Sequence, residues 1–232
     1  MISSAALCPG APLLARELTG LDPVVPALRE SCAAAVSGML RGMPDIVVVV
    51  GLASRTATWP ATAQWSTSGF RGRAGPKDPD ALPLALGLGA MLINDAGYQG
   101  PLVMQGVGEH EPVTKCIDIG TGIRDSSDRV GLLVMADGSC RRDAKAPGYF
   151  DERAISFDLE IERFIRSADL DALLGVDQET AHELMAQGRP AWQVLAGATR
   201  GQEYDAKILY SDAPFGVAYL VAFFLWRTPG GG

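Results

Sequence analysis

A chain of 232 residues with 47% hydrophobic residues and 20% charged residues predicts one folded domain with a sizeable core. The formal net charge of -7 disfavours a sequence-independent grip on nucleic acid, which depends on Lys and Arg neutralising phosphates. No segment is basic and amphipathic, and the apolar run Val217–Trp226 is too short to cross a bilayer, so we expect no membrane binding.

The N-terminal residues MISSAALCPG lack the positive region and the long apolar stretch of a signal peptide. We therefore expect a cytoplasmic location. The cysteines lie far apart in the sequence and form no C-x-x-C motif, which predicts reduced thiols rather than a disulfide framework or a zinc site; they are Cys8, Cys32, Cys116 and Cys140.

The first part of the chain predicts strands and helices in alternation. Residues 2–7 form a short apolar strand, and apolar residues at helical spacing predict a helix over Val24–Arg41 that ends before Pro44. Ile46–Val50 is a run of β-branched residues and predicts a second strand. This strand, helix, strand order predicts that the two strands pair in parallel through a right-handed crossover.

Residues 54–80 are rich in Thr, Ser, Gly and Pro and predict a long loop, with a short strand around Ala63–Phe70. Pro83 can begin a helix that runs to about Ala96, and Leu102–Gln105 predicts a further strand. The segment GVGEHEPVTKCIDIGTGI that follows predicts either a short strand between turns or the start of a helix.

The second half continues this pattern. Val130–Met135 is an apolar run without alternation, which is typical of a strand buried on both faces of an α/β sheet. Three helices and two strands are expected after it: a helix capped by Asp151 that ends near Ser167, one capped by Asp177 that ends at Gly188, one over Ala191–Ala198, and strands at Lys207–Tyr210 and Val217–Trp226. We predict a single α/β domain over residues 1–227, with a mostly parallel mixed sheet flanked by helices, and a disordered tail over residues 228–232.

Polar and charged side chains crowd the end of the strand Val130–Met135. In open α/β sheets, ligands bind at the carboxyl ends of the strands. The arginines there can clamp a carboxylate or a phosphate, or they can pair with the neighbouring aspartates. The residues predicted to bind a ligand follow three of the expected strands; they are Ser54, Arg55, Asp137, Ser139, Arg141, Arg142 and Asp212.

Two other residue types suggest chemistry. His110 lies between Glu109 and Glu111, which are ligand types for a divalent metal, but adjacent residues of an extended chain point to opposite faces. His182 is expected to be a solvated histidine on the polar side of its helix. Cys140 lies beside arginines that can activate a thiol, with a buried, inert cysteine as the favoured interpretation.

Five motifs together carry a resemblance to a known family. They are CPGAPLL after the first strand, VVVVG before a polar loop, DGSCRRDAKAPGYFDERA, GRPAWQVLAGA and DAPFGVAYLVA. This combination resembles the LigB-type superfamily, which includes the class III extradiol ring-cleavage dioxygenases, and in particular an actinobacterial branch of it. The resemblance covers nearly the whole chain and implies a LigB-like α/β fold with a site at one end of the sheet. In the active enzymes, a non-haem Fe(II) held by two histidines and a carboxylate binds a catechol and dioxygen.

The positions that the resemblance implies for histidines hold other residues here. They are Gly10 after the first strand, Ala53–Thr56 after the second, and Ser139–Arg142 for the acid-base histidine. Glycine, serine and arginine cannot replace neutral imidazoles on iron. We therefore expect a LigB-like pseudoenzyme without a cofactor that binds a small, anionic or aromatic ligand. Two alternatives stay open: a diverged ring-cleavage dioxygenase with Fe(II) on His110, Asp137 or Asp212, and a structural or partner-binding protein that forms homo-oligomers.

Overall fold

The computed structural model describes residues 1–16, 24–63, 65 and 81–227. Within them, one sheet of seven strands has the order β3-β4-β2-β5-β1-β7-β6. The strands are β1 (Ile2–Cys8), β2 (Ile46–Ala53), β3 (Ala57–Trp59), β4 (Leu102–Gly108), β5 (Val130–Met135), β6 (Tyr204–Asp212) and β7 (Tyr219–Trp226). The α-helices are α1 (Val24–Leu40), α2 (Leu84–Asp95), α3 (Val113–Asp125), α4 (Arg153–Ser167), α5 (Gln178–Glu183) and α6 (Arg189–Thr199).

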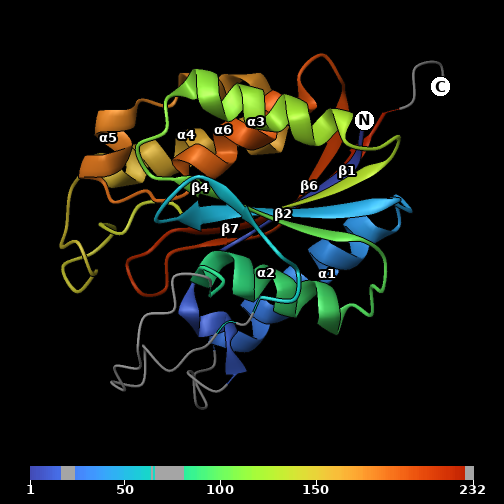
Figure 1. Ribbon diagram of the computed structural model, residues 1–232. Helices are drawn as coiled ribbons and strands as arrows, with labels where there is room; N and C mark the ends of the chain where they lie inside the picture. Colours follow the sequence, from blue (N-terminus) through green and yellow to red (C-terminus); the bar gives the residue numbers. More distant parts are fainter. Residues whose placement is uncertain (17–23, 64, 66–80, 228–232) are drawn as a thin grey trace.

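The sheet lies between two layers of helices, as expected for an α/β domain. Figure 1 shows α1 and α2 against one face and α3, α4 and α6 against the other, with α5 at one end of the sheet. Strands β4, β2, β5 and β1 are mutually parallel. At the two sides of the sheet the pairing is antiparallel: β3 pairs with β4, and β7 pairs with both β1 and β6. The predicted fold class, a mixed sheet with a parallel centre flanked by helices, is confirmed.

The first two strands are parallel, but they are not neighbours as the sequence predicted. Strand β5 lies between them and pairs with both, Ala6 opposite Leu133 on one side and Val49 opposite Leu133 on the other. A crossover fixes the relative direction of two strands and leaves room for a third strand to be inserted. Strand β5, which is buried at every position, takes this central place, with a paired strand at each edge and a layer of helices over each face.

Alternating side chains of the central strands serve two separate cores. Val47 and Val49 of β2 face the layer of α1 and α2, whereas Val48 and Val50 face the layer of α3, α4 and α6. Because side chains of a strand alternate between the faces, a strand covered on both sides needs apolar residues at every position. This explains the run of four valines.

Helices α3 and α6 approach each other closely through two glycines. A Cβ at Gly120 would lie 2.4 Å from the carbonyl oxygen of Val194, and a Cβ at Gly197 would lie 2.7 Å from the Cα of Ile117. Neither distance is compatible with a side chain. The contact places α6, and with it Arg189 at its start, directly beside the segment that joins β4 to α3.

Several boundaries differ from the prediction. Strand β3 lies at Ala57–Trp59, before the expected strand around Ala63–Phe70, most of which falls outside the described residues, as does the predicted tail over 228–232. The segment after Gln105 first extends β4 to Gly108 and then forms α3. Helix α5 ends at Glu183 rather than at Gly188, because Met185 adopts a left-handed backbone with φ of 54°. Among the described residues, no helix is both long and apolar enough to cross a membrane.

Candidate functional site

The parallel strands end together and form a cleft at the carboxyl edge of the sheet. Its inner recess has a volume of about 110 Å³ and is lined by Gly10, Leu52, Leu84, Ala85, Met135, Ala136, Asp137 and Gln187. Its outer recess is wider, about 400 Å³, and is lined by Leu52, Ala53, Ser54, Pro83, Glu109 and His110. Leu52 belongs to both recesses, so we treat them as one carboxyl-edge cleft. The cleft lies where ligands bind in open α/β folds.

Asp137 is the ionisable side chain of the inner recess. The residue as a whole is half-buried, but its Oδ1 atom is sealed from solvent and has no hydrogen-bond partner. The backbone N–H of Gly10 donates to the carboxyl group, which favours the ionised form, but burial is the larger effect and raises the pKa of Asp137 to about 7. Near neutral pH this carboxyl can therefore hold or release a proton.

The backbone around Asp137 is fixed by neighbouring segments. The N–H of Ala136 donates to the carbonyl of Cys8 at 2.8 Å, and the N–H of Gly188 donates to the carbonyl of Asp137 at 2.9 Å. Gly10 faces the carboxyl closely, since a Cβ at this position would lie 3.5 Å from Asp137 Oδ2 and 3.4 Å from Ala85 Cβ. These are ordinary contact distances, so the lack of a side chain at Gly10 leaves open the space of one methyl group.

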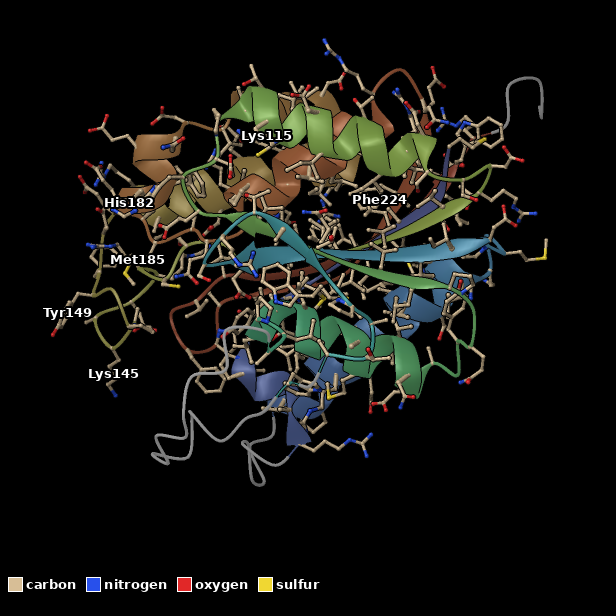
Figure 2. The ribbon with its side chains drawn as sticks, in the orientation of Figure 1. Lys115, Lys145, Tyr149, His182, Met185 and Phe224 are labelled. Atoms are coloured by element: carbon tan, nitrogen blue, oxygen red, sulfur yellow. The ribbon has the colours of Figure 1, made fainter. Side chains whose placement is uncertain are left out.

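Both histidines of the chain meet beside the outer recess, which His110 lines and His182 does not. Nδ1 of His182, on α5, lies 2.9 Å from Oε1 of Glu109. The rings of His110 and His182 are in edge-to-face contact, with centroids 5.3 Å apart and an interplanar angle of 61°. One ligand atom from each of these three residues lies within 4.8 Å of the others. Figure 2 shows His182 at the same end of the molecule as Met185 and Tyr149.

Buried side chains hold the segment that carries Glu109 and His110. Arg189 of α6 is buried and donates to the carbonyl oxygens of Glu109 and Glu111, the latter at 3.0 Å. The hydroxyl of Thr56 donates to the carboxylate of Glu111 and accepts from the N–H of Gly108 at 2.9 Å. The backbone at the end of β4 is therefore anchored to the loop between β2 and β3 and to α6.

Two of the predicted ligand-binding residues belong to another part of the molecule. Ser139 donates from Oγ and from its backbone N–H to the carboxylate of Asp158 on α4, at 2.6 and 2.8 Å. Arg142 donates to the same carboxylate at 3.2 Å. Burial raises the pKa of Asp158, and these three donors oppose the shift. We call Ser139, Arg142 and Asp158 the Asp158 cluster; it joins the loop after β5 to α4.

The other predicted residues are dispersed. Arg55 stacks over the ring of Trp59 at 5.2 Å, and Oδ1 of Asp212 accepts from the N–H of Ala213 at 2.7 Å in the turn after β6. Asp212 also lines a separate cavity of about 220 Å³ with Arg142, Asp158 and Glu162. The buried Nε of Arg141 has no hydrogen-bond partner. Of the seven residues, the structure places Ser54 and Asp137 in the carboxyl-edge cleft.

The cysteines are free thiols, as expected from their spacing. Burial, together with the charges of Asp137 and Asp158, raises the pKa of Cys140 to about 12. A hydrogen bond with Cys32 and burial raise the pKa of Cys8. The neighbouring arginines suggested a lowered pKa for the Cys140 thiol. Burial and the two aspartates raise it instead, so the thiol stays protonated at neutral pH.

The ferrous ion that the family resemblance implies does not fit the implied positions. Gly10 offers no ligand atom, Ser54 and Arg55 offer no imidazole, and Ser139 and Arg142 are engaged with Asp158. The alternative iron ligands His110, Asp137 and Asp212 do not lie together. His110 groups with Glu109 and His182, and neither aspartate belongs to that group. His182 is exposed, as the sequence predicted, but its contact with Glu109 and His110 was not predicted, because 72 positions separate it from His110 and only the tertiary fold joins them.

Comparisons with known proteins support the fold. No family model matches the chain, and no curated protein matches it. The structure is similar to the crystal structure of an uncharacterized protein, JW3007, from Escherichia coli K12, with a TM-score of 0.55 and 15% sequence identity. The match covers 96% of this chain and 99% of the other chain. At this identity the likeness shows that the two proteins share a fold.

Proposed function

We propose that this protein binds a small organic ligand in the carboxyl-edge cleft, with Asp137 as the group that anchors it. The observation that carries the proposal is the Oδ1 atom of Asp137, which is sealed from solvent without a hydrogen-bond partner beside an open recess. A buried polar atom without a partner costs about 1 to 3 kcal/mol. A ligand that donates a hydrogen bond to this oxygen removes that cost.

The lining of the inner recess indicates the chemistry of the ligand. Apart from Asp137 and Gln187, the side chains that line it are apolar. Ligand sites typically combine such apolar walls with a few polar groups that orient the ligand. A small aromatic or aliphatic group that carries a neutral or cationic hydrogen-bond donor suits this recess. The aromatic ligand expected from the sequence is therefore compatible with this recess.

An anionic ligand has less support. Arg142 is paired with Asp158, Arg55 is stacked on Trp59, and neither lines the cleft. In the separate cavity, Arg142 faces Asp158, Glu162 and Asp212, so carboxylates outnumber the cation there. An anion in either place would meet a carboxylate without a matching positive charge.

A panel of matched ring compounds tests this proposal. We would titrate metal-free, ¹⁵N-labelled protein with phenol, benzylamine and benzoate and follow the backbone amide shifts. Phenol and benzylamine are expected to shift the amides of Gly10, Asp137 and Gln187, and benzoate is expected to leave them unchanged. Shifts confined to the separate cavity around Arg142 and Asp212, or equal responses to all three probes, would contradict the proposal.

A partner-binding role is a second candidate, and exposed apolar side chains favour it. Tyr149, Phe150, Ile155 and Leu159 are exposed, with Leu159 at 56% of its surface, and Ile155 and Leu159 are one helical turn apart on α4. The partner proposed here is a second copy of the chain. Sedimentation velocity of the wild-type protein and of Leu159→Lys tests it: a dimer that the substitution dissociates supports the role, and a monomer at every concentration contradicts it.

A further inference from the structure

We propose that Glu109, His110 and His182 form a binding site for one divalent transition-metal ion at the rim of the outer recess. The three residues come from two distant segments, the turn after β4 and helix α5. Their ligand atoms already lie within 4.8 Å of one another. This site does not depend on the small ligand proposed above or on Asp137.

The ligand types define the class of metal. Two imidazoles and one carboxylate are the set that binds zinc in catalytic sites and iron in non-haem sites, with open positions left for water or a substrate. Oxygen-only sites, which suit Mg²⁺ and Ca²⁺, have no need of histidine. The geometry therefore indicates Zn²⁺, Co²⁺, Fe²⁺ or a similar ion rather than Mg²⁺ or Ca²⁺.

The contact between Glu109 and His182 permits two ways of holding the ion. In the first, the ion replaces the contact between His182 Nδ1 and Glu109 Oε1, which lie 2.9 Å apart, and binds all three side chains. In the second, that contact persists and orients the ring, so that Nε2 of His182 binds the metal and Glu109 acts as its outer partner. In both arrangements His110 and His182 bind the metal, so the loss of either histidine lowers the metal affinity more than the loss of Glu109.

The surrounding structure fixes the ligands before a metal arrives. Arg189 holds the carbonyl oxygens on both sides of His110, those of Glu109 and Glu111. Helix α5 is capped by Asp177, whose Oδ1 accepts from the N–H of Thr180 at 2.8 Å. The ion pair between Glu183 and Arg153, at 2.7 Å, ties the residue after His182 to α4. A site whose ligand segments are already ordered loses less conformational entropy when it binds an ion.

The location connects the proposed metal with the cleft. Glu109 and His110 line the outer recess, whereas His182 approaches them from α5. Open coordination positions at the metal would therefore face the recess, next to Ser54. This gives the outer recess a Lewis acid that the side chains of the inner recess do not supply.

Metal titration of protein without a polyhistidine tag tests the inference. After dialysis against a chelator, Zn²⁺ is titrated in competition with a fluorescent zinc indicator, and Co²⁺ binding is followed by its visible spectrum. Because the chain has two histidines, the long-range ¹H–¹⁵N spectrum of labelled histidine side chains should show two ring systems, and both should shift as one Zn²⁺ per chain is added. Binding without a shift of either ring would overturn the inference.

Variants locate the ion. His110→Ala and His182→Ala should each lower the Zn²⁺ affinity by about 100-fold, and Glu109→Gln by about tenfold. Glu203→Gln, which removes an exposed carboxylate just before β6, should leave it unchanged. Unchanged affinity in both histidine variants, or a sulfur-to-cobalt charge-transfer band, would show that the metal binds elsewhere. A stoichiometry below one Zn²⁺ per chain would also overturn the inference. The phenol titration is made without metal, so the two proposals fail independently.

Discussion

Two aspartates on either side of the loop after β5, the half-buried Asp137 and the buried Asp158, have different surroundings. Burial raises the pKa of both Asp137 and Asp158. Asp158 accepts three hydrogen bonds, two from Ser139 and one from Arg142, whereas Oδ1 of Asp137 accepts none. The comparison teaches that burial alone does not identify a functional carboxylate. A fully partnered carboxylate joins elements of the fold, whereas one with an unpartnered oxygen beside a recess is the better candidate for a ligand-binding group.

The largest expected effect separates these two roles by stability. Asp158→Ala leaves the side chains of Ser139 and Arg142 without their partner, and we expect the free energy of unfolding to fall by about 3 kcal/mol. Asp137→Ala should not lower it, because no side chain loses a partner and the cost of ionising a buried carboxyl at pH 7 is removed. Urea denaturation at pH 7 followed by circular dichroism measures both. Equal losses would mean that Asp137 is as structural as Asp158.

The pH dependence of stability tests the environment of Asp137. Its folded-state pKa of about 7 lies above the ordinary value of 3.8, so between these values the folded state holds a proton that the unfolded state has released. The folded state therefore loses stability as pH rises through this window, by up to about 1.4 kcal/mol per pH unit. Asp137→Asn removes this contribution, so its stability relative to wild type should rise by about 3.5 kcal/mol from pH 4 to pH 7.5.

Urea denaturation at both pH values gives this difference directly. Asp158 is unchanged in Asp137→Asn, and its own titration cancels in the comparison with wild type. A relative stability that does not vary with pH would show that Asp137 is solvated and has an ordinary pKa. Asp212→Asn, which removes an exposed carboxylate at the end of β6, is the matched control.

A smaller effect concerns the space beside Asp137. Gly10→Ala places a methyl group in ordinary contact with Ala85 and Asp137, so stability should change by less than about 0.5 kcal/mol. The methyl group occupies part of the inner recess, and the affinity for phenol should fall about tenfold, as expected for a misplaced methylene in an apolar pocket. Titration by NMR measures the affinity. An unchanged value would place the phenol outside this recess.

The smallest effect uses Cys140, which senses both aspartates. Their charges contribute to its raised pKa, after burial. Asp137→Asn should lower the pKa of the thiol by about half a unit and increase its reaction rate with Ellman's reagent at pH 9 about threefold. Cys8, Cys32 and Cys116 are fully buried and should react only after unfolding. A rate equal to that of wild type would place the Asp137 charge too far away to act on this thiol.

Local sequence patterns were sufficient for most of the elements. Periodic apolar residues predicted α1, Pro83 marked the start of α2, and the cap at Asp177 marked the start of α5. These signals are local, because helix periodicity and capping depend on residues within one or two turns. The early end of α5 was missed, since the left-handed backbone at Met185 carries no glycine to mark it.

The place of each strand and the composition of the site were decided by the tertiary structure. The apolar run Val130–Met135 was enough to predict a strand buried on both faces, with polar residues after it. Only the fold inserted this strand between β1 and β2, turned Ser139 and Arg142 toward Asp158 and left Asp137 in the cleft. Likewise, only the fold joined His182 to Glu109 and His110. The physical reason is that a contact between distant segments depends on how whole elements pack, which no local pattern of residues records.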